Sequence, residues 1–333
     1  MTRAPAGLAR VAVRVPAKIN LFLAVRGRRD DGMHDIVSIM HTVGVHDVVT
    51  VAFGGPRAAM HHPAGRRVME VELQLGTGGG APPDDANLAV RAARALASSA
   101  GNGWSLRRGG GGRGAAERGR QWPVTRVRLD KRIPVGAGMA GGSADAAGTL
   151  IALNRLWDCD LSLDQLRDIG AALGADVPFC VGGGTALATG TGVTTAQVLC
   201  RGRFQLVLGI SDRPLATADV YRCWDEIGVA SRAEPDAVLQ ALRTADPVAL
   251  GEALHNDLQP AAFHLRPELR ARRDALLAAG ALGVVVSGSG PTLVGLTDGA
   301  QAARRVARAV RHLFDRVEVA RSPAGGPEVV EER

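Results

Sequence analysis

A glycine-rich stretch at residues 134–148, PVGAGMAGGSADAAG, has the composition that most directly suggests chemistry. Its glycines allow the backbone to approach a ligand closely, and the alanine-rich segment that follows is typical of a helix. The free N–H groups in the first turn of such a helix favour negative charge. The stretch is therefore predicted to hold a polyphosphate, and the simpler alternative is a tight turn that binds no ligand.

Two common phosphate-binding motifs do not fit this stretch in full. Gly136, Gly138 and Gly141 satisfy the pattern G-x-G-x-x-G, but a dinucleotide site also needs a second parallel strand after the helix. Here the helical pattern that ends near Trp157 is followed by another helical pattern. The Walker pattern is excluded as well, because no lysine follows the glycines. What remains is the feature that both motifs share, a flexible loop at the start of a helix.

Lys18 and Asp176 are the side chains best suited to act beside a bound phosphate. Lys18 and Lys131 are the only lysines among 40 basic residues, so position 18 suggests a role for a compact ammonium rather than a planar guanidinium. Asp176 lies two residues after Gly174, the expected end of a helix, and precedes the apolar residues Val-Pro-Phe. A partly buried carboxylate in such a place suits a general base, and a turn or capping aspartate is the alternative.

The patterns around these residues predict the elements that must position them. Apolar alternation with a period of two predicts strands, and a period near 3.6 predicts helices. In the first part of the chain the expected strands are at 11–25 (two short strands joined across Pro16 and Lys18), 45–53, 68–75, 124–134, 180–192 and 203–210. The expected helices there are at 84–100, 145–157 and 162–173, the last with Ser162 as its N-cap.

The pattern begins afresh near residue 201, which predicts a second domain. After its first strand we expect helices at 216–228, 235–243, 247–255 and 265–280, then two strands, a helix and a last strand. The predicted organisation is a domain at 1–195 that holds the glycine-rich stretch, a domain at 200–322 and a flexible tail at 323–333. Surface insertions are expected at 54–66 and 101–121, the second consisting mainly of glycine and arginine.

Composition narrows the class of protein. The formal net charge is +7 and almost all basic residues are arginine, which indicates a coding bias and favours anionic ligands. The four cysteines show no metal-ligand spacing and are expected to be free thiols in a reducing cytoplasm. The N-terminus has no signal-peptide pattern, and no run of about 18 apolar residues is present. We therefore expect a cytoplasmic protein with no membrane partner.

The glycine-rich stretch resembles the phosphate loop of the GHMP family of small-molecule kinases, in the branch whose substrate carries a cytidine diphosphate. Four more segments resemble motifs of that branch in the same order: PAKINLFLAV (16–25), RRDDGMHDI (28–36), GADVPFC (174–180) and SGSGPT (287–292). The shorter segments ATADVY (216–221) and HNDLQP (255–260) also fit. The resemblance extends over residues 13–318.

This resemblance implies a fold and a reaction. The fold would be α+β with two domains, the N-terminal one like ribosomal protein S5 domain 2 and the C-terminal one ferredoxin-like, with the active site in the cleft between them. The reaction would be transfer of the γ-phosphate of ATP to the 2-hydroxyl of 4-diphosphocytidyl-2-C-methyl-D-erythritol, a step of non-mevalonate isoprenoid synthesis. Mg²⁺ would accompany ATP, and glycines stand where other branches of the family offer a serine to the metal, so no metal ligand is implied.

The resemblance also assigns roles to single residues. The segment that would bind ATP comprises Pro134, Val135, Gly136, Ala137, Gly138, Met139, Ala140, Gly141, Gly142, Ser143 and Ala144. Asp176 would be the base that activates the hydroxyl, Lys18 would stabilise the developing alkoxide, and Asn20 would lie near the same end of the substrate. His34 would hydrogen-bond the cytosine, and Tyr221, the only tyrosine, would stack on it.

Departures from the motifs leave two alternatives open. Met33 stands where the branch has a second stacking tyrosine, which leaves open a GHMP kinase that phosphorylates another small alcohol. Ala140 and Ala144 replace the usual glycine and serine of the loop, at a cost in backbone freedom and in one hydroxyl. The arginine–glycine segment leaves open a non-catalytic RNA-binding protein, although a solvated insertion also explains its composition.

Overall fold

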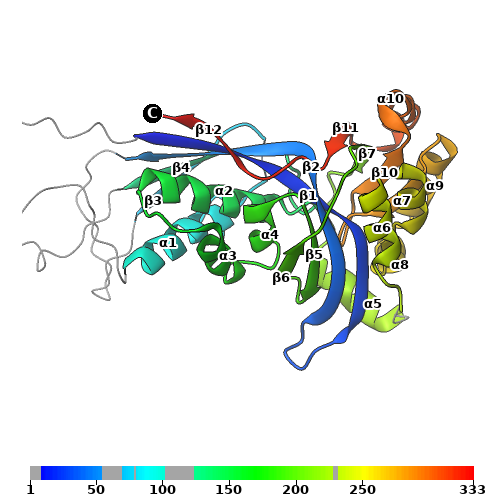
Figure 1. Ribbon diagram of the computed structural model, residues 1–333, viewed down its shortest axis with the longest axis horizontal. Coiled ribbons are helices and arrows are strands. Elements are labelled where there is room, and N and C mark those ends of the chain that lie inside the picture. The colour runs from blue at the N-terminus through cyan, green and yellow to red at the C-terminus, as the bar shows by residue number, and fades with distance from the viewer. Residues whose placement is uncertain (1–8, 55–69, 79, 102–123, 228–231) are drawn as a thin grey trace, which may run out of the picture.

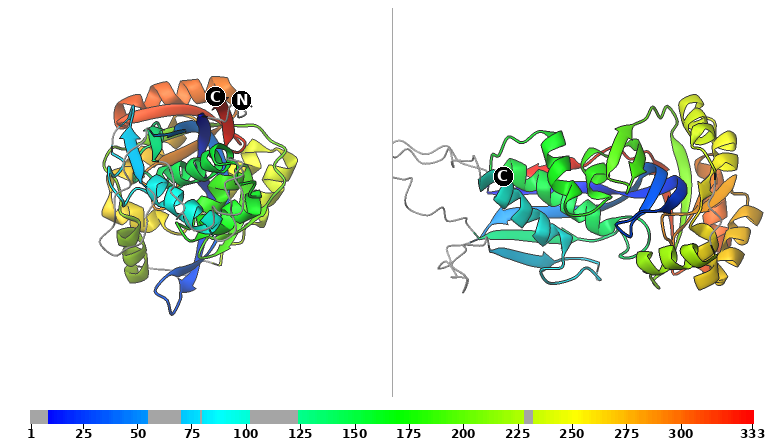
Figure 2. Two further views of the ribbon diagram at one scale, coloured as in Figure 1. Left: turned by 90° about the vertical axis from the view of Figure 1, so that its left-hand side faces the viewer. Right: turned by 90° about the horizontal axis from the view of Figure 1, so that it is seen from below.

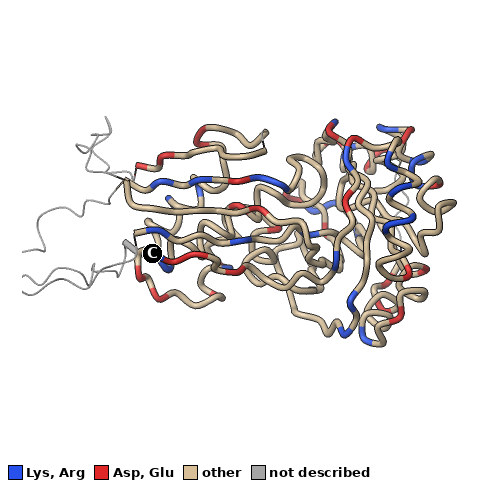
Figure 3. The backbone as a smooth tube through the Cα atoms, turned by 90° about the horizontal axis from the view of Figure 1, so that it is seen from above, with Lys and Arg blue, Asp and Glu red and all other residues tan. Residues whose placement is uncertain are grey.

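An elongated molecule is built on two sheets in this computed structural model, which describes residues 9–54, 70–78, 80–101, 124–227 and 232–333 (Figure 1). The predicted insertions at 54–66 and 101–121 lie, except for their first residues, outside the described residues. Within the described part of the chain, the helices fall short of the length and hydrophobicity that crossing a membrane requires. Charged residues of both signs are spread along the described backbone (Figure 3).

The larger sheet is organised around two long antiparallel strands, β1 (Arg10–Arg28) and β2 (His34–Phe53). Its other strands are β3 (Val71–Leu75), β4 (Thr125–Asp130), β5 (Thr185–Gly190), β6 (Thr194–Gln197), β8 (His255–Asn256) and β12 (Glu328–Glu332). The strand order is β12-β1-β2-β4-β3, with β5 paired to β2, β6 to β5 and β8 to β1. The β3–β4 and β1–β8 pairs are parallel.

β1 is one continuous strand, where the sequence pattern predicted two short ones. Its register with β2 shifts between Pro16 and Ala17 and again between Asn20 and Phe22. Proline cannot donate to the ladder, so a bulge at Pro16 lets the strand continue past it. Bulges also re-aim the neighbouring side chains, and both Lys18 and Asn20 are buried.

Four helices cover one face of this sheet (Figure 1): α1 (Leu88–Gly101), α2 (Gly141–Leu156), α3 (Leu163–Ala171) and α4 (Val177–Gly182). α2 lies very close to the sheet, because a Cβ added at Gly148 would stand 2.7 Å from Val15 and 2.8 Å from Val49. α3 begins with the predicted cap, since the Ser162 hydroxyl accepts from the Gln165 N–H.

α4 occupies residues at which the sequence pattern predicted the start of a strand, 180–192. The strand prediction is wrong for residues 180–182, and β5 begins only at Thr185. Pro178 stands in the first turn of α4, where its fixed φ and missing N–H favour a helix start. Gly183 then ends the helix with φ of 65°.

The smaller sheet is antiparallel, in the order β11-β7-β10-β9. Its strands are β7 (Phe204–Ile210), β9 (Gly283–Val286), β10 (Leu293–Thr297) and β11 (Arg316–Ser322). The helices are α5 (Thr217–Ile227), α6 (Asp236–Thr244), α7 (Pro247–Ala253), α8 (Gln259–Leu265), α9 (Glu268–Ala278) and α10 (Gly299–Val310), followed by the 3₁₀ turn Arg311–Leu313. Figure 2 shows this sheet with α9 and α10 at one end of the molecule, and the predicted α+β architecture with a ferredoxin-like second half is confirmed.

Two late segments of the chain add strands to the first sheet. β8 pairs with β1 at Phe22 and Leu23, and β12 pairs with β1 from Val11 to Arg14. The prediction of a flexible tail at 323–333 is therefore wrong for residues 328–332 (Figure 1 marks the C-terminus beside β1). An open strand edge favours pairing with any suitable segment, and nothing in the tail's own sequence shows that such an edge lies nearby.

All four cysteines are free thiols, as predicted. Burial raises the pKa of Cys159 to about 12, and it raises the pKa of the fully buried Cys180 as well. Since the thiolate is the reactive form, neither group is a nucleophile at neutral pH.

Candidate active site

The glycine-rich loop, residues 134–140, follows β4 and leads into α2. Gly136 and Gly138 have positive φ values of 65° and 75°, and Ala140 has φ of 55° directly before the helix. This left-handed conformation costs alanine about 1–2 kcal/mol relative to glycine, so the departure at position 140 carries a backbone penalty. Alanine has no polar atom with which to cap α2, which leaves the first N–H groups of the helix for an anion.

The loop between β9 and β10, residues 287–292, packs against the glycine-rich loop. The Ser287 hydroxyl donates to the Gly138 carbonyl at 2.9 Å. A Cβ added at Gly138 would stand 2.0 Å from the carbonyl oxygen of Ser287, so this approach requires glycine. The SGSGPT segment therefore lies beside the glycine-rich loop, and the second half of the chain contributes to the candidate site.

Lys18 and Asp176 form an ion pair beside the glycine-rich loop. Lys18 Nζ lies 3.4 Å from Asp176 Oδ2, and the two side chains are 6% and 30% exposed. The Lys18 N–H donates to the Met139 carbonyl at 3.3 Å, which ties β1 to the loop. The structure therefore brings Lys18 together with two segments that lie more than 100 residues further along the sequence, and it leaves the Asp176 carboxylate accessible from solvent.

Asn20 holds the ammonium of this ion pair in place. Its Oδ1 accepts from Lys18 Nζ at 2.8 Å, and its Nδ2 donates to the Ser38 hydroxyl at 2.7 Å. Ser38 in turn donates to the Phe22 carbonyl at 2.7 Å. This buried chain of hydrogen bonds fixes Lys18 relative to β1 and β2.

Asn256 is a residue of the candidate site that the sequence did not single out. Its Nδ2 donates to the carbonyls of Val286 and Gly288 at 2.7 and 2.8 Å, which shapes the loop after β9. A Cβ added at Gly288 would stand 3.3 Å from Asn20 Oδ1 and 3.7 Å from Lys18 Nζ, so this loop reaches the ion pair. The sequence signal that could have identified Asn256 was its position in the HNDLQP segment, between two other polar residues.

His34 and Tyr221 also come together, as part of an aromatic cluster. Their ring centroids lie 4.5 Å apart at an interplanar angle of 29°, and Trp224 meets the His34 ring edge-on at 5.7 Å. His34 Nε2 lies 2.7 Å from Asp225 Oδ1. Sequence reasoning missed Trp224 and Asp225, although their positions three and four residues after Tyr221 place them on the same face of α5.

The aromatic cluster lies within electrostatic reach of the ion pair. Burial raises the pKa of Tyr221 to about 12, and the Asp176 carboxylate contributes to the rise. Met33 stands next to His34 with its side chain 52% exposed, so its thioether is available to cover a ligand. Tyr221, predicted for one end of a substrate, thus lies close enough to Asp176, predicted for the other end, for its pKa to respond to that carboxylate.

The described part of the chain was also compared with what a metal ion bound by protein side chains would need. Among the described residues, no group of three or more His, Cys, Asp or Glu side chains could hold one. Mg²⁺ usually binds through one or two carboxylates together with substrate phosphates. We assign no protein ligand to a metal ion among the described residues.

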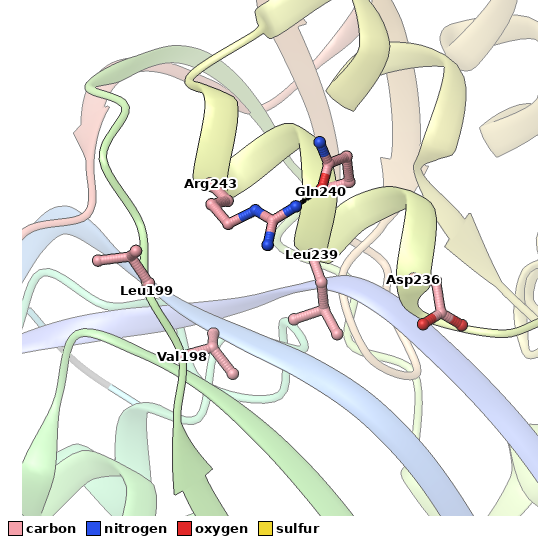
Figure 4. Close-up of a pocket in the computed structure, with 6 residues that line it drawn as sticks. All are labelled: Val198, Leu199, Asp236, Leu239, Gln240 and Arg243. Carbon is pink, nitrogen blue, oxygen red and sulfur yellow. Dashed lines mark hydrogen bonds between the residues drawn. The ribbon is translucent and has the colours of Figure 1, made fainter.

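A separate hollow of about 440 Å³ lies between residues 198–199 and α6 (Figure 4). It is lined by Val198, Leu199, Asp236, Leu239, Gln240 and Arg243. None of the predicted site residues contributes to this lining. The hollow is therefore distinct from the candidate active site.

Comparison with known proteins identifies related chains over nearly the whole length. The family model described as GHMP kinases N terminal domain matches residues 87–184, and the model GHMP kinases C terminal matches residues 238–316. A 4-diphosphocytidyl-2-C-methyl-D-erythritol kinase of Salinispora tropica is 43% identical over 303 residues, which cover 89% of this chain and 86% of the relative.

Solved structures agree with these sequence matches. A crystal structure of 4-(cytidine 5'-diphospho)-2C-methyl-D-erythritol kinase is 30% identical, with a TM-score of 0.71, and the match covers 94% of this chain and 100% of that one. A homoserine kinase from Cytophaga hutchinsonii also has a TM-score of 0.71, covering 99% of both chains, but it is 17% identical. The second match concerns the fold alone.

Proposed function

This chain belongs to the GHMP kinase family, and from that premise we propose that it transfers the γ-phosphate of ATP to the 2-hydroxyl of 4-diphosphocytidyl-2-C-methyl-D-erythritol. The product would serve the non-mevalonate route to isoprenoids. The observation that carries the proposal is the 3.4 Å ion pair of Lys18 and Asp176 beside a glycine-rich loop at the start of a helix. Phosphoryl transfer needs this combination of a phosphate site and an activated hydroxyl.

Each group of the ion pair has a task in the proposed reaction. Asp176 accepts the proton of the acceptor hydroxyl, and its 30% exposure allows the hydroxyl to approach. Lys18 lies where its ammonium neutralises the developing alkoxide, and Asn20 keeps it there. The first N–H groups of α2 bind the phosphates. Mg²⁺, when bound with ATP, neutralises further charge on them.

The aromatic cluster would bind the cytidine. Tyr221 supplies a flat face for stacking, and its position is fixed by the His34 ring 4.5 Å away. His34 Nε2 is held by Asp225, so the other ring nitrogen would make the hydrogen bond to the base. Met33 would take the place of a second aromatic ring, with a softer contact.

Release of ADP with different acceptors tests the proposed substrate. The purified protein with ATP and Mg²⁺ is expected to release ADP with the cytidylyl substrate, and to release little with homoserine, mevalonate or galactose. Preferential turnover of one of those three alcohols would contradict the substrate assignment while leaving the kinase assignment intact. Absence of turnover with all four would contradict both.

Removing the stacking ring is expected to weaken substrate binding selectively. Stacking of a base on an aromatic ring contributes about 1–3 kcal/mol, so Tyr221→Leu is expected to raise the KM for the cytidylyl substrate about 5- to 100-fold. The KM for ATP is expected to stay unchanged. Steady-state kinetics with each substrate varied in turn checks this, and Tyr221→Phe, which keeps the ring, is the matched control. An equal rise for both substrates would show that Tyr221 has another role.

A further inference from the structure

Lys131, the second of the two lysines, is buried directly behind the glycine-rich loop with its side chain 3% exposed. Its Nζ lies 2.5 Å from Asp47 Oδ2 and 2.6 Å from Asp145 Oδ2. The same ammonium donates to the Gly141 carbonyl at 3.3 Å. We call Lys131, Asp47 and Asp145 the Lys131 cluster. Charges buried in this way are costly unless they are paired, so the three residues depend on one another.

The Lys131 cluster contacts both ends of the glycine-rich loop. On the near side, Asp47 Oδ1 accepts from the N–H groups of Arg132 and Ile133 at 2.6 and 2.8 Å, directly before the loop begins. On the far side, Asp145 stands in the second turn of α2 and Gly141 is its first residue. The Lys131 ammonium hydrogen-bonds to Gly141 and Asp145 on the far side and to Asp47 on the near side. One ammonium therefore joins the two ends of the loop.

We propose that the Lys131 cluster positions the glycine-rich loop for nucleotide binding. By holding residues 132–133 and the start of α2 at a fixed separation, it would set where the N–H groups of the helix meet the phosphates. Its members touch no substrate and would act through the loop, as positioning residues. The inference rests on the proposed function, because it assumes that the loop binds ATP.

The charge balance of the cluster supports a link between the loop and pH. Two buried carboxylates, Asp47 and Asp145, share the one ammonium of Lys131. Burial, opposed by Lys131 and supported by Asp47, raises the pKa of Asp145 to about 7. The titratable groups that face it are Lys131, Asp47 on β2 and the un-ionised thiol of Cys180 on α4.

The sign of the pH effect follows from this balance. With a proton on Asp145 the buried charges of the cluster balance, and loss of that proton as pH rises adds one negative charge beneath the helix start. A negative charge there opposes a bound phosphate, so nucleotide affinity is expected to fall as pH rises through about 7. The folded form holds the Asp145 proton more tightly than the unfolded form, whose pKa is 3.8, so the contribution of Asp145 to stability also falls between pH 3.8 and about 7.

Binding of a non-hydrolysable ATP analogue with Mg²⁺, measured by calorimetry without an acceptor alcohol, tests the proposal. Lys131→Met is expected to weaken binding about 2- to 30-fold, the range by which substitutions that do not touch a ligand change its affinity. Arg155→Met is the matched control, because it removes a basic side chain at the other end of α2, whose 3.3 Å ion pair with Glu332 is largely exposed. The control is expected to bind as the wild type does.

Asp145→Asn distinguishes an effect of the cluster on the position of the glycine-rich loop from an effect on the stability of the fold alone. Asparagine keeps an acceptor for Lys131 and cannot titrate, so this variant is expected to retain affinity and to lose the decline in affinity through about pH 7. Protonation of the ATP analogue itself is the same in both experiments. The difference between the two pH profiles of affinity therefore reports Asp145 alone.

Three results would decide against the proposal or its premise. A folded Lys131→Met variant that binds the analogue as tightly as the wild type would overturn the proposal, since the cluster would then serve only the fold. If Lys131→Met does not fold, identical pH profiles of the wild type and Asp145→Asn would overturn it. A wild-type protein that binds no nucleotide would instead refute the proposed function, and with it the premise.

Discussion

Asp176→Asn is expected to lower kcat about 10²- to 10⁴-fold, the range that a general base contributes. The amide matches the carboxylate in size and keeps an acceptor for Lys18, 3.4 Å away, but it cannot take up the proton of the hydroxyl. The glycine-rich loop and α2 are untouched, so the affinity for ATP is expected to change little. Single-turnover kinetics together with calorimetric titration of the ATP analogue separates these two effects.

Asp164→Asn provides the control for the loss of a carboxylate. Asp164 is an 85% exposed aspartate of α3 that pairs with Arg167 at 2.8 Å, and its replacement is expected to leave kcat unchanged. Full turnover by Asp176→Asn would exclude Asp176 as the base. A parallel loss of ATP affinity and turnover would instead indicate that the substitution disturbs the loop.

Lys18→Met is expected to lower kcat about 10²- to 10³-fold, as removal of one group that stabilises transition-state charge does. The reason is geometric. Lys18 Nζ is held 2.8 Å from Asn20 Oδ1 and 3.4 Å from Asp176 Oδ2, and a water molecule in its place would carry no positive charge. The KM for the cytidylyl substrate is expected to change less than kcat. Steady-state kinetics checks this, with thermal unfolding of the variant as the test that it remains folded.

Lys18→Arg distinguishes a positioned ammonium from positive charge alone. The side chain of Lys18 is 6% exposed and close to Gly288, so a planar guanidinium has no room to place its donors at the same point. We expect the arginine variant to stay well below wild-type activity. Wild-type kcat in Lys18→Arg would mean that charge in this region suffices and that the fixed geometry is unimportant.

The two substitutions are expected to be non-additive. Lys18 and Asp176 contact each other and act on one hydroxyl, so the double variant is expected to lose little more activity than Asp176→Asn alone. Additive losses would indicate that the two residues serve separate steps.

Much of the site was predictable from the sequence because its features are local. Glycines 136, 138 and 141 mark a loop before a helix whatever the rest of the chain does, and the loop is found there with positive φ at two of them. Apolar periodicity also located most strands and helices, since one face of each must be buried. The prediction of two short strands failed at Pro16, because a bulge there keeps β1 continuous.

The sequence by itself therefore determined the glycine-rich loop before a helix, and its resemblance to a known family implied the α+β class and made Lys18, Asp176, His34 and Tyr221 candidates for the site. Only the tertiary structure decided how distant segments pair. It added β12 to the edge of β1, placed Asn256 of β8 against the loop after β9, and set Asp47 and Asp145 on either side of Lys131. Local periodicity records which face of an element is buried, whereas the partner that a buried polar group finds depends on chain topology, because that partner lies far away in the sequence.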